Sequence, residues 1–142
     1  MQAGMAELTS GGLNQLRIGR VEQGRIEVGA PRSKFMLGGL WTTGNWSLSA
    51  TATRYGEFTV LFDAVETTPT RDQTFGAEWT LDLAATYEMG QWDFSIGGDN
   101  VLDAFPDEAI YQNSTFGQLP YSASSPFGFN GRFMYARMGY RW

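Results

Sequence analysis

Cysteine and histidine are both absent from this chain of 142 residues. Without cysteine the protein has no disulfide framework, no thiolate metal ligand and no cysteine nucleophile. Without histidine it lacks the usual base of serine hydrolases and the commonest metal ligand. We therefore expect no catalytic residue, no metal site and no cofactor, and we predict that the protein is not an enzyme.

Basic residues and long hydrophobic runs are also scarce. The net charge of −5 argues against nucleic acid as a partner, because that binding requires a basic surface. No apolar run approaches the roughly 18 residues of a transmembrane helix. Residues 1–10 lack the basic and apolar segments of a signal peptide. If the protein is exported, we expect the chain to begin after processing or to be a fragment.

Aromatic residues and glycine are abundant, which favours β structure with tight turns. Residues 131–142 alternate strictly, and 9 to 11 residues are roughly enough for a tilted β-strand to cross a membrane. One parity is apolar: Met134, Ala136, Met138, Tyr140 and Trp142. The other contains Arg137 and Arg141, whereas Arg132 falls on the apolar parity near the expected outer rim. The pattern predicts a strand with one apolar face.

Four further segments show the same alternation, which predicts strands at residues 34–43, 46–53, 78–88 and 92–98. The clearest is 78–88, with an apolar parity of Trp79, Leu81, Leu83, Ala85 and Tyr87. Its other parity is Glu78, Thr80, Asp82, Ala84, Thr86 and Glu88. The strand at 46–53 continues less clearly to residue 62. In 34–43, Phe35, Leu37, Gly39 and Trp41 form the expected apolar face, although Met36 and Leu40 offer the opposite register.

The connections alternate in length. Short turns at Gly44-Asn45 and residues 89–91 alternate with long polar segments at 63–76 and 103–130. Outer-membrane β-barrels have short periplasmic turns and long extracellular loops. We therefore predict an all-β fold: about five antiparallel strands of a transmembrane β-barrel.

Two sets of side chains follow from this topology. Aromatic residues beside the short turns are expected at the membrane interface: Trp41, Trp46, Tyr87, Trp92, Tyr140 and Trp142. Charged residues on the polar parity are expected to face the lumen: Glu78, Asp82, Glu88, Arg137 and Arg141. The two arginines either pair with lumenal acids or line a path for anions, and we favour the pairing. Asp99, Asn100 and Asp103 either form a plain turn or contribute to a calcium site, and we favour the turn.

A soluble β-sandwich remains an alternative, because its strands also alternate. A soluble core, however, would more often distribute Trp and Tyr through its depth. Their concentration beside the short turns favours the membrane barrel.

Two segments resemble TonB-dependent outer-membrane receptors. Residues 124–142, SSPFGFNGRFMYARMGYRW, are similar to the closing strand of that family, and residues 96–106, IGGDNVLDAFP, to its penultimate strand and turn. The resemblance covers residues 31–142, and residues 1–30 form a poorly defined segment. It implies a location in the bacterial outer membrane and a role in uptake of a ferric siderophore, cobalamin or glycan. It also implies that Met138, Tyr140 and Trp142 belong to the signal that the barrel-assembly machinery recognises.

This chain is much smaller than a complete receptor of that family. The family's barrels have roughly 22 strands around a plug, which TonB contacts through a short N-terminal segment, and neither feature is visible here. A five-stranded open sheet in lipid leaves two edges of unpaired backbone groups. We therefore expect a fragment or split subunit of a receptor, whose partners are lipid, the remaining strands and the plug. The alternative is a structural or pore-forming subunit whose copies close one barrel.

Overall fold

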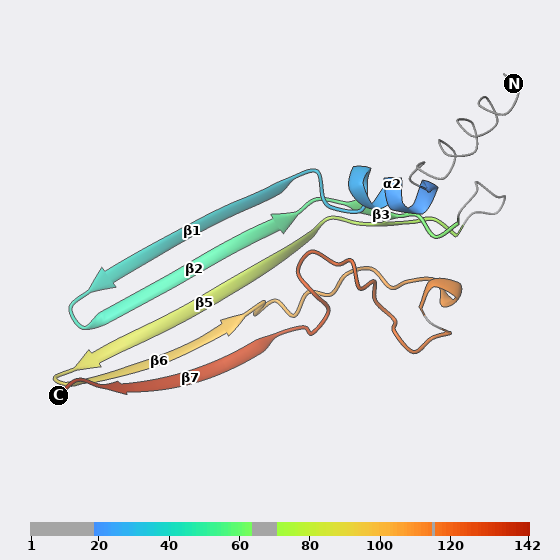
Figure 1. The fold of residues 1–142 in the computed structure, drawn as a ribbon. Coiled ribbons are helices and arrows are strands. Elements are labelled where there is room, and N and C mark those ends of the chain that lie inside the picture. Colours follow the sequence, from blue (N-terminus) through green and yellow to red (C-terminus); the bar gives the residue numbers. More distant parts are fainter. Residues whose placement is uncertain (1–18, 64–70, 115) are drawn as a thin grey trace, which may run out of the picture.

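The computed structural model describes residues 19–63, 71–114 and 116–142. Five strands form one antiparallel sheet in the order β1-β2-β5-β6-β7, and two short strands pair separately (Figure 1). In chain order the elements are α2 (Arg20–Glu27), β1 (Lys34–Thr43), β2 (Trp46–Tyr55), β3 (Phe58–Val60), β4 (Gln73–Phe75), β5 (Glu78–Met89), β6 (Trp92–Asp99), the 3-10 helix η1 (Tyr111–Asn113) and β7 (Phe133–Tyr140). The prediction of five long antiparallel strands is confirmed. Among the described residues, no helix is long and apolar enough to span a membrane.

The hairpin of β2 and β5 continues beyond the large sheet. β2 pairs β5 as far as Tyr55 and Glu78, and the pairing of β3 with β4 resumes at Phe58 and Phe75 in the same register. Between them the ladder is interrupted by two glycines. The Gly56 N–H donates to the Ser33 carbonyl oxygen at 2.8 Å, and the Gly76 N–H donates to an Asp107 carboxylate oxygen at 2.6 Å.

Part of one predicted loop is therefore a strand. The sequence analysis assigned residues 63–76 to a connection without secondary structure, which is wrong for β4. Three residues are too few to display an alternation, and β4 forms because β3 lies opposite it. Residues 64–70 lie outside the described part of the chain.

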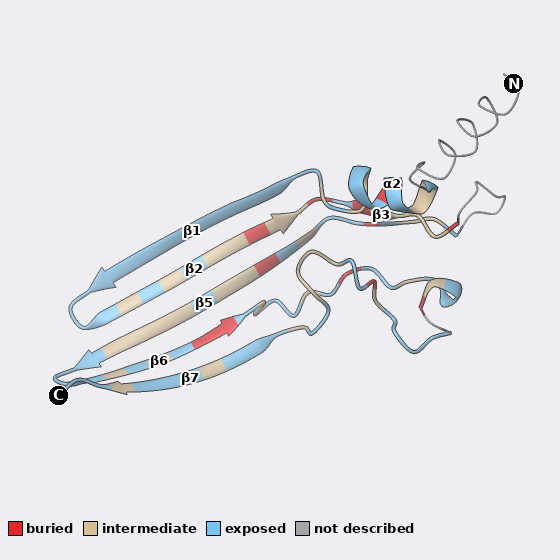
Figure 2. Cartoon of the chain, viewed as in Figure 1, coloured by how far each residue is buried: buried red, intermediate tan, exposed pale blue. Residues whose placement is uncertain are grey.

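The large sheet is a single layer. Figure 2 shows its strands mostly exposed or half-buried, with no element of the described chain laid across the sheet as a second layer. Among the described residues, the buried hydrophobic side chains are Phe58 and Phe75, whose rings stack with centroids 4.9 Å apart. The small core thus lies in the β3-β4 extension, beside the long connections, and not on the sheet.

α2 packs against this extension. Its Gly24 is buried, and a Cβ added there would lie 2.4 Å from a terminal methyl carbon of Leu61. The Thr59 N–H in β3 donates to the Val28 carbonyl oxygen at 2.8 Å. The sequence analysis left this helix within the poorly defined residues 1–30. A glycine inside a helix costs about 1 kcal/mol relative to alanine and so weakens the local signal for a helix. Residues 1–18 lie outside the described part of the chain.

Candidate membrane-facing and polar surfaces

The strand register sorts the side chains of the sheet onto two faces, because directly paired residues lie on the same face. Leu83 in the centre of β5 pairs with Ala50 on one side and Gly98 on the other, and these pair in turn with Gly39 and Met134. The neighbouring row on this face runs through Trp41, Leu48, Ala85, Ile96 and Ala136. The apolar parities of all five strands therefore form one continuous apolar face.

The register of β1 agrees with its predicted parity. Phe35 and Trp41 join the apolar face, opposite Arg54 and Leu48. Met36 and Leu40 join the other face. The pairing with β2 thereby decides a register that the sequence of β1 left open.

This apolar face is uncovered by the described part of the chain. Leu37 is 66% exposed, Trp41 58%, Ile96 59% and Met138 62%. A contiguous apolar surface of this extent marks a site of contact with membrane or protein. Contact between this apolar surface and water is unfavourable.

The apolar face is hollowed where its residues are small. A groove of about 680 Å³ runs over Gly39, Ala50 and Gly98, with Trp41 and Ile96 among its larger lining residues. Glycine and alanine leave the backbone accessible there.

Aromatic residues lie at the short-turn end of this face. The ring centroids of Trp46 and Tyr87 lie 4.7 Å apart, as do those of Trp92 and Tyr140. The Tyr140 hydroxyl donates to Gln91 Oε1 at 2.6 Å. Tyr140 therefore combines an aromatic neighbour with a polar partner at the rim, the combination that suits a membrane interface.

Trp41 and Trp142 complete this group. Trp41 pairs with Leu48 and lies two residues before the end of β1. Trp142 is fully exposed, and its ring contacts that of Tyr140 edge-on at 6.4 Å. All six predicted interface aromatics thus lie toward the short-turn end of the sheet.

A second aromatic pair lies at the opposite end of the same face. Phe35 and Trp79 flank Arg54 in one cross-strand row. At the short-turn end, Met89 pairs with Trp92, which in turn pairs with Tyr140. Trp79 lies ten positions before Met89 in the same strand. That is about 33 Å along a strand, or about 25 Å along the axis of a barrel whose strands tilt by about 40°. The sequence analysis missed this second rim because it weighed only the aromatics beside the short turns.

The opposite face is polar. It contains every acidic residue of the five strands: Glu78, Asp82, Glu88, Asp93 and Asp99. The hydroxyls of Thr86 and Ser95 are hydrogen-bonded across it at 2.8 Å. An Asp82 carboxylate oxygen accepts the Asn100 N–H at 2.8 Å. Such a surface suits contact with water.

The two arginines of this face behave differently. Arg141 forms an ion pair with Glu88 at 2.8 Å, with both side chains more than half exposed. Arg137 pairs across strands with Ser95 and lies over the Tyr135 ring at 6.0 Å. In the described chain Arg137 makes no ion pair. Arg141 thus pairs with an acidic residue of the same face, whereas Arg137 has no ion pair among the described residues.

The connection after β6 begins with the expected turn. The side-chain amide of Asn100 donates to the Ala104 carbonyl oxygen at 2.8 Å and accepts the Ala104 N–H at 3.0 Å. Asn100 and Asp103 both adopt a positive φ. An Asp103 carboxylate oxygen accepts the Arg132 N–H at 2.8 Å. These side chains serve the local backbone, as in an Asx turn.

This long connection also contacts the polar face. Phe127 lies against Tyr55, with ring centroids 5.3 Å apart, and Tyr55 is the polar-face residue opposite Lys34 and Glu78. One row further into the sheet, Thr53 and Thr80 are buried. The connection thus narrows access to the polar face at the end where the long segments gather.

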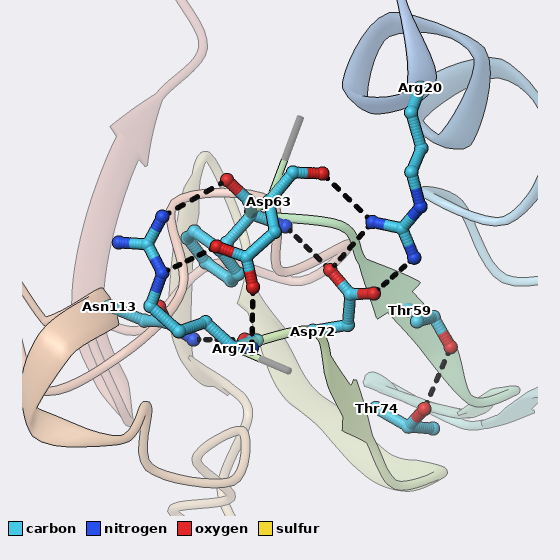
Figure 3. A network of polar contacts seen from close by, with 8 residues as sticks. Arg20, Thr59, Asp63, Arg71, Asp72, Thr74 and Asn113 are labelled. Carbon is cyan, nitrogen blue, oxygen red and sulfur yellow. Dashed lines mark hydrogen bonds and ion pairs between the residues drawn. The ribbon is translucent and has the colours of Figure 1, made fainter. Parts of the chain in front are cut away.

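A polar network at the same end joins segments far apart in sequence (Figure 3). Arg20 in α2 forms an ion pair with Asp72 and donates to the Asp63 carbonyl oxygen at 2.9 Å. Arg71 donates its N–H and its Nε–H to the Asp63 carboxylate, both at 2.7 Å. Asn113 donates to the Arg71 carbonyl oxygen at 2.8 Å.

The electrostatics of this network follow from those bonds. The backbone hydrogen bond from Arg71, then that from its side chain, lower the pKa of Asp63. Both carboxylates are occupied by arginines, an arrangement that fixes a loop. The network ties together α2, the β3-β4 hairpin and η1.

No protein-family model, curated protein or solved structure significantly matches this chain.

Proposed function

We propose that this chain is a non-enzymatic component of a TonB-dependent transporter in the bacterial outer membrane. The observation that carries the proposal is the division of a single-layer sheet into one uncovered apolar face and one charged face. A membrane barrel requires this division, because lipid meets one side of each strand and water the other. The two aromatic rims support it, since their separation of about 25 Å equals the usual height of the apolar band.

In this proposal each surface has a role. The apolar face contacts lipid, and the face that carries Glu78, Asp82, Glu88, Arg137 and Arg141 lines the lumen. Long connections at the outer end contribute to ligand access, because one of them already reaches over the polar face at Phe127 and Tyr55. The transported class is a scarce ligand such as a ferric siderophore, cobalamin or a glycan.

The missing parts must come from other strands. β1 and β7 are the edges of the open sheet, and unpaired backbone groups cost several kcal/mol each in lipid. We propose that the remaining strands and the plug, in the same receptor or in partner chains, close the barrel. TonB contacts the plug, and the barrel-assembly machinery inserts the whole.

Cell fractionation tests this proposal. We expect a tagged form of the chain, produced in its own bacterium, to remain in the outer-membrane fraction after carbonate extraction. Blue native electrophoresis of the detergent extract should show it together with a plug-bearing polypeptide. Quantitative release of the chain by carbonate would contradict the membrane assignment and favour a soluble β-domain.

A second candidate is favoured by the two open edges of the sheet. Copies of this chain could pair β1 of one with β7 of the next and close an oligomeric barrel, as a pore or a structural subunit. The same electrophoresis distinguishes the candidates, because such a barrel would contain only multiples of the 15.8 kDa chain.

A further inference from the structure

The apolar face contains a single charged residue within its strands. Of the charged side chains in the five strands, all but one lie on the polar face: Lys34, Glu78, Asp82, Glu88, Asp93, Asp99 and Arg137. The exception is Arg54 of β2, which the register places between Phe35 and Trp79. A guanidinium on an otherwise apolar surface requires a physical reason.

Arg54 lies where such a charge is tolerated. Its row is at the outer end of the face, near the long connections, and charges on a lipid-facing surface cost little near the interface. Its side chain is half-buried, and within the described chain it has neither an ion pair nor a side-chain hydrogen bond. The guanidinium is therefore available to an external anion.

Nothing acidic on the same face competes for it. Every carboxylate of the five strands projects from the opposite face. A planar guanidinium with five N–H donors binds phosphate oxygens in pairs. The neighbouring rings of Phe35 and Trp79 offer the apolar part of a lipid a favourable contact surface.

We propose that Arg54 binds the phosphate of an anionic lipid headgroup, whose acyl chain lies in the groove over Gly39, Ala50 and Gly98. This inference rests on the proposed membrane function. Four residues separate Arg54 from Ala50 in β2, a distance of about 13 Å along the strand. The groove thus lies within the roughly 15 Å depth of one leaflet, half of a 30 Å hydrocarbon core. One lipid can therefore occupy both features.

Vesicle flotation tests the inference with the complete assembly, because the open sheet needs its partner strands in lipid. The detergent-extracted assembly that contains the chain is reconstituted into vesicles of phosphatidylcholine alone, or of phosphatidylcholine with phosphatidylglycerol. We expect the unmodified protein to partition into the anionic vesicles about fivefold more strongly than the Arg54→Gln variant. A factor of about five is the usual effect of one basic residue at an anionic surface. On neutral vesicles the two proteins should partition equally.

Lys34→Gln is the matched control. It removes one positive charge at the same end of the sheet, but from the polar face, where Lys34 lies over the Tyr55 ring at 4.9 Å. We expect this variant to retain most of the preference for anionic vesicles. An equal loss in both variants would mean that net charge alone drives the preference, and would overturn the inference.

The remaining outcomes separate this inference from the proposed function. If the unmodified chain partitions equally into both kinds of vesicle, it is a membrane protein without an anionic-lipid site. If the assembly that contains the unmodified chain partitions into neither kind of vesicle, the proposed membrane function fails as well.

Discussion

Neighbouring residues of β5 experience different surroundings, because a strand directs successive side chains to opposite faces. Leu83 is 42% exposed at the centre of the apolar face, between Ala50 and Gly98. Thr86, three residues later, is hydrogen-bonded to Ser95 on the polar face. In the proposed barrel, the two positions separate contact with lipid from contact with water.

Lysine substitutions at these positions test the assignment of the faces. Leu83→Lys should lower the free energy of unfolding of the bilayer-embedded assembly by about 2 to 4 kcal/mol, the cost of a cation near the midplane. Thr86→Lys should cost no more than the lost hydrogen bond, about 1 kcal/mol. Urea titration in lipid vesicles measures both. Similar losses in the two variants would contradict the assignment.

The lowered pKa of Asp63 predicts a pH dependence at the end of the molecule where the long connections lie. Because its pKa is lowered by the bonds from Arg71, folding favours the ionised form. The stabilisation is complete above the ordinary carboxyl pKa of about 3.9 and is lost as the pH falls through the lowered value. The protection factor of the Arg71 amide, its exchange rate relative to that of an unfolded chain at the same pH, should therefore fall on acidification below about pH 4.

Asp63→Asn is the control for this prediction. It cannot ionise, so the Arg71 amide should exchange faster than in the unmodified protein at neutral pH, and the step below pH 4 should disappear. A step that persists in Asp63→Asn would assign the titration to another carboxylate, such as Asp72.

At the scale of elements, α2 packs closely against the β3-β4 extension because Gly24 has no side chain. The position of Gly24 leaves no room for a Cβ, which would lie 2.6 Å from Leu61 Cγ and 3.2 Å from its Cβ. Rotation of the leucine side chain cannot move the latter atom away. The contact thus depends on glycine, although glycine weakens the helix itself.

Gly24→Ala should therefore loosen the helix from the hairpin. The expected overpacking cost of about 1 to 3 kcal/mol exceeds the roughly 1 kcal/mol gained in helix propensity. Hydrogen exchange of residues 20–28 should accelerate. Combining Gly24→Ala with Leu61→Ala removes the two closest leucine atoms, at 2.4 and 2.6 Å, and should return part of the protection. Unchanged exchange in Gly24→Ala alone would show that α2 is held by the Arg20 contacts instead.

The end of β7 is fixed to the neighbouring turn. The Arg141 N–H donates to the Gln91 carbonyl oxygen at 2.8 Å, and the Arg141 side chain pairs with Glu88. Together with the Tyr140 and Trp92 ring contact, these interactions hold the last residues against β5 and β6.

Removal of residues 140–142 should therefore impair barrel assembly. In the complete assembly we expect less heat-modifiable barrel in the outer membrane, because both the rim contacts and the proposed assembly signal are lost. Trp142→Phe keeps a terminal aromatic ring and should assemble almost normally. A normal yield of the truncated barrel would argue against a role of Met138, Tyr140 and Trp142 in assembly.

For the whole molecule, the two ends of the sheet differ in a way that predicts topology. Figure 1 shows the short turns and the C-terminus at one end, with α2, β3 and the long connections at the other. In the proposed outer-membrane barrel, the long connections face outward and the short turns face the periplasm.

Cysteine labelling tests this orientation, since the chain has no cysteine of its own. Ala123 and Asn45 are exposed residues at opposite ends. On intact cells an impermeant maleimide should label Ala123→Cys and leave Asn45→Cys unmodified until the outer membrane is permeabilised. Equal labelling of both on intact cells would refute the orientation.

The sequence by itself determined the five long strands and the two parities of most of them. These features are local, because a period of two requires only neighbouring residues to reveal a face. The short turns at Gly44 and Gly90 were equally visible, and both glycines adopt a positive φ. Tight turns of this kind favour glycine strongly.

The tertiary structure decided what depends on distant partners. Arg20 and Asp72 are 52 residues apart, and β4 forms only opposite β3. The register of β1 and the isolated position of Arg54 on the apolar face required the pairing of β1, β2 and β5. No pattern within one segment contains that information, because cross-strand contacts are made between residues whose separation in sequence is set by the intervening loops.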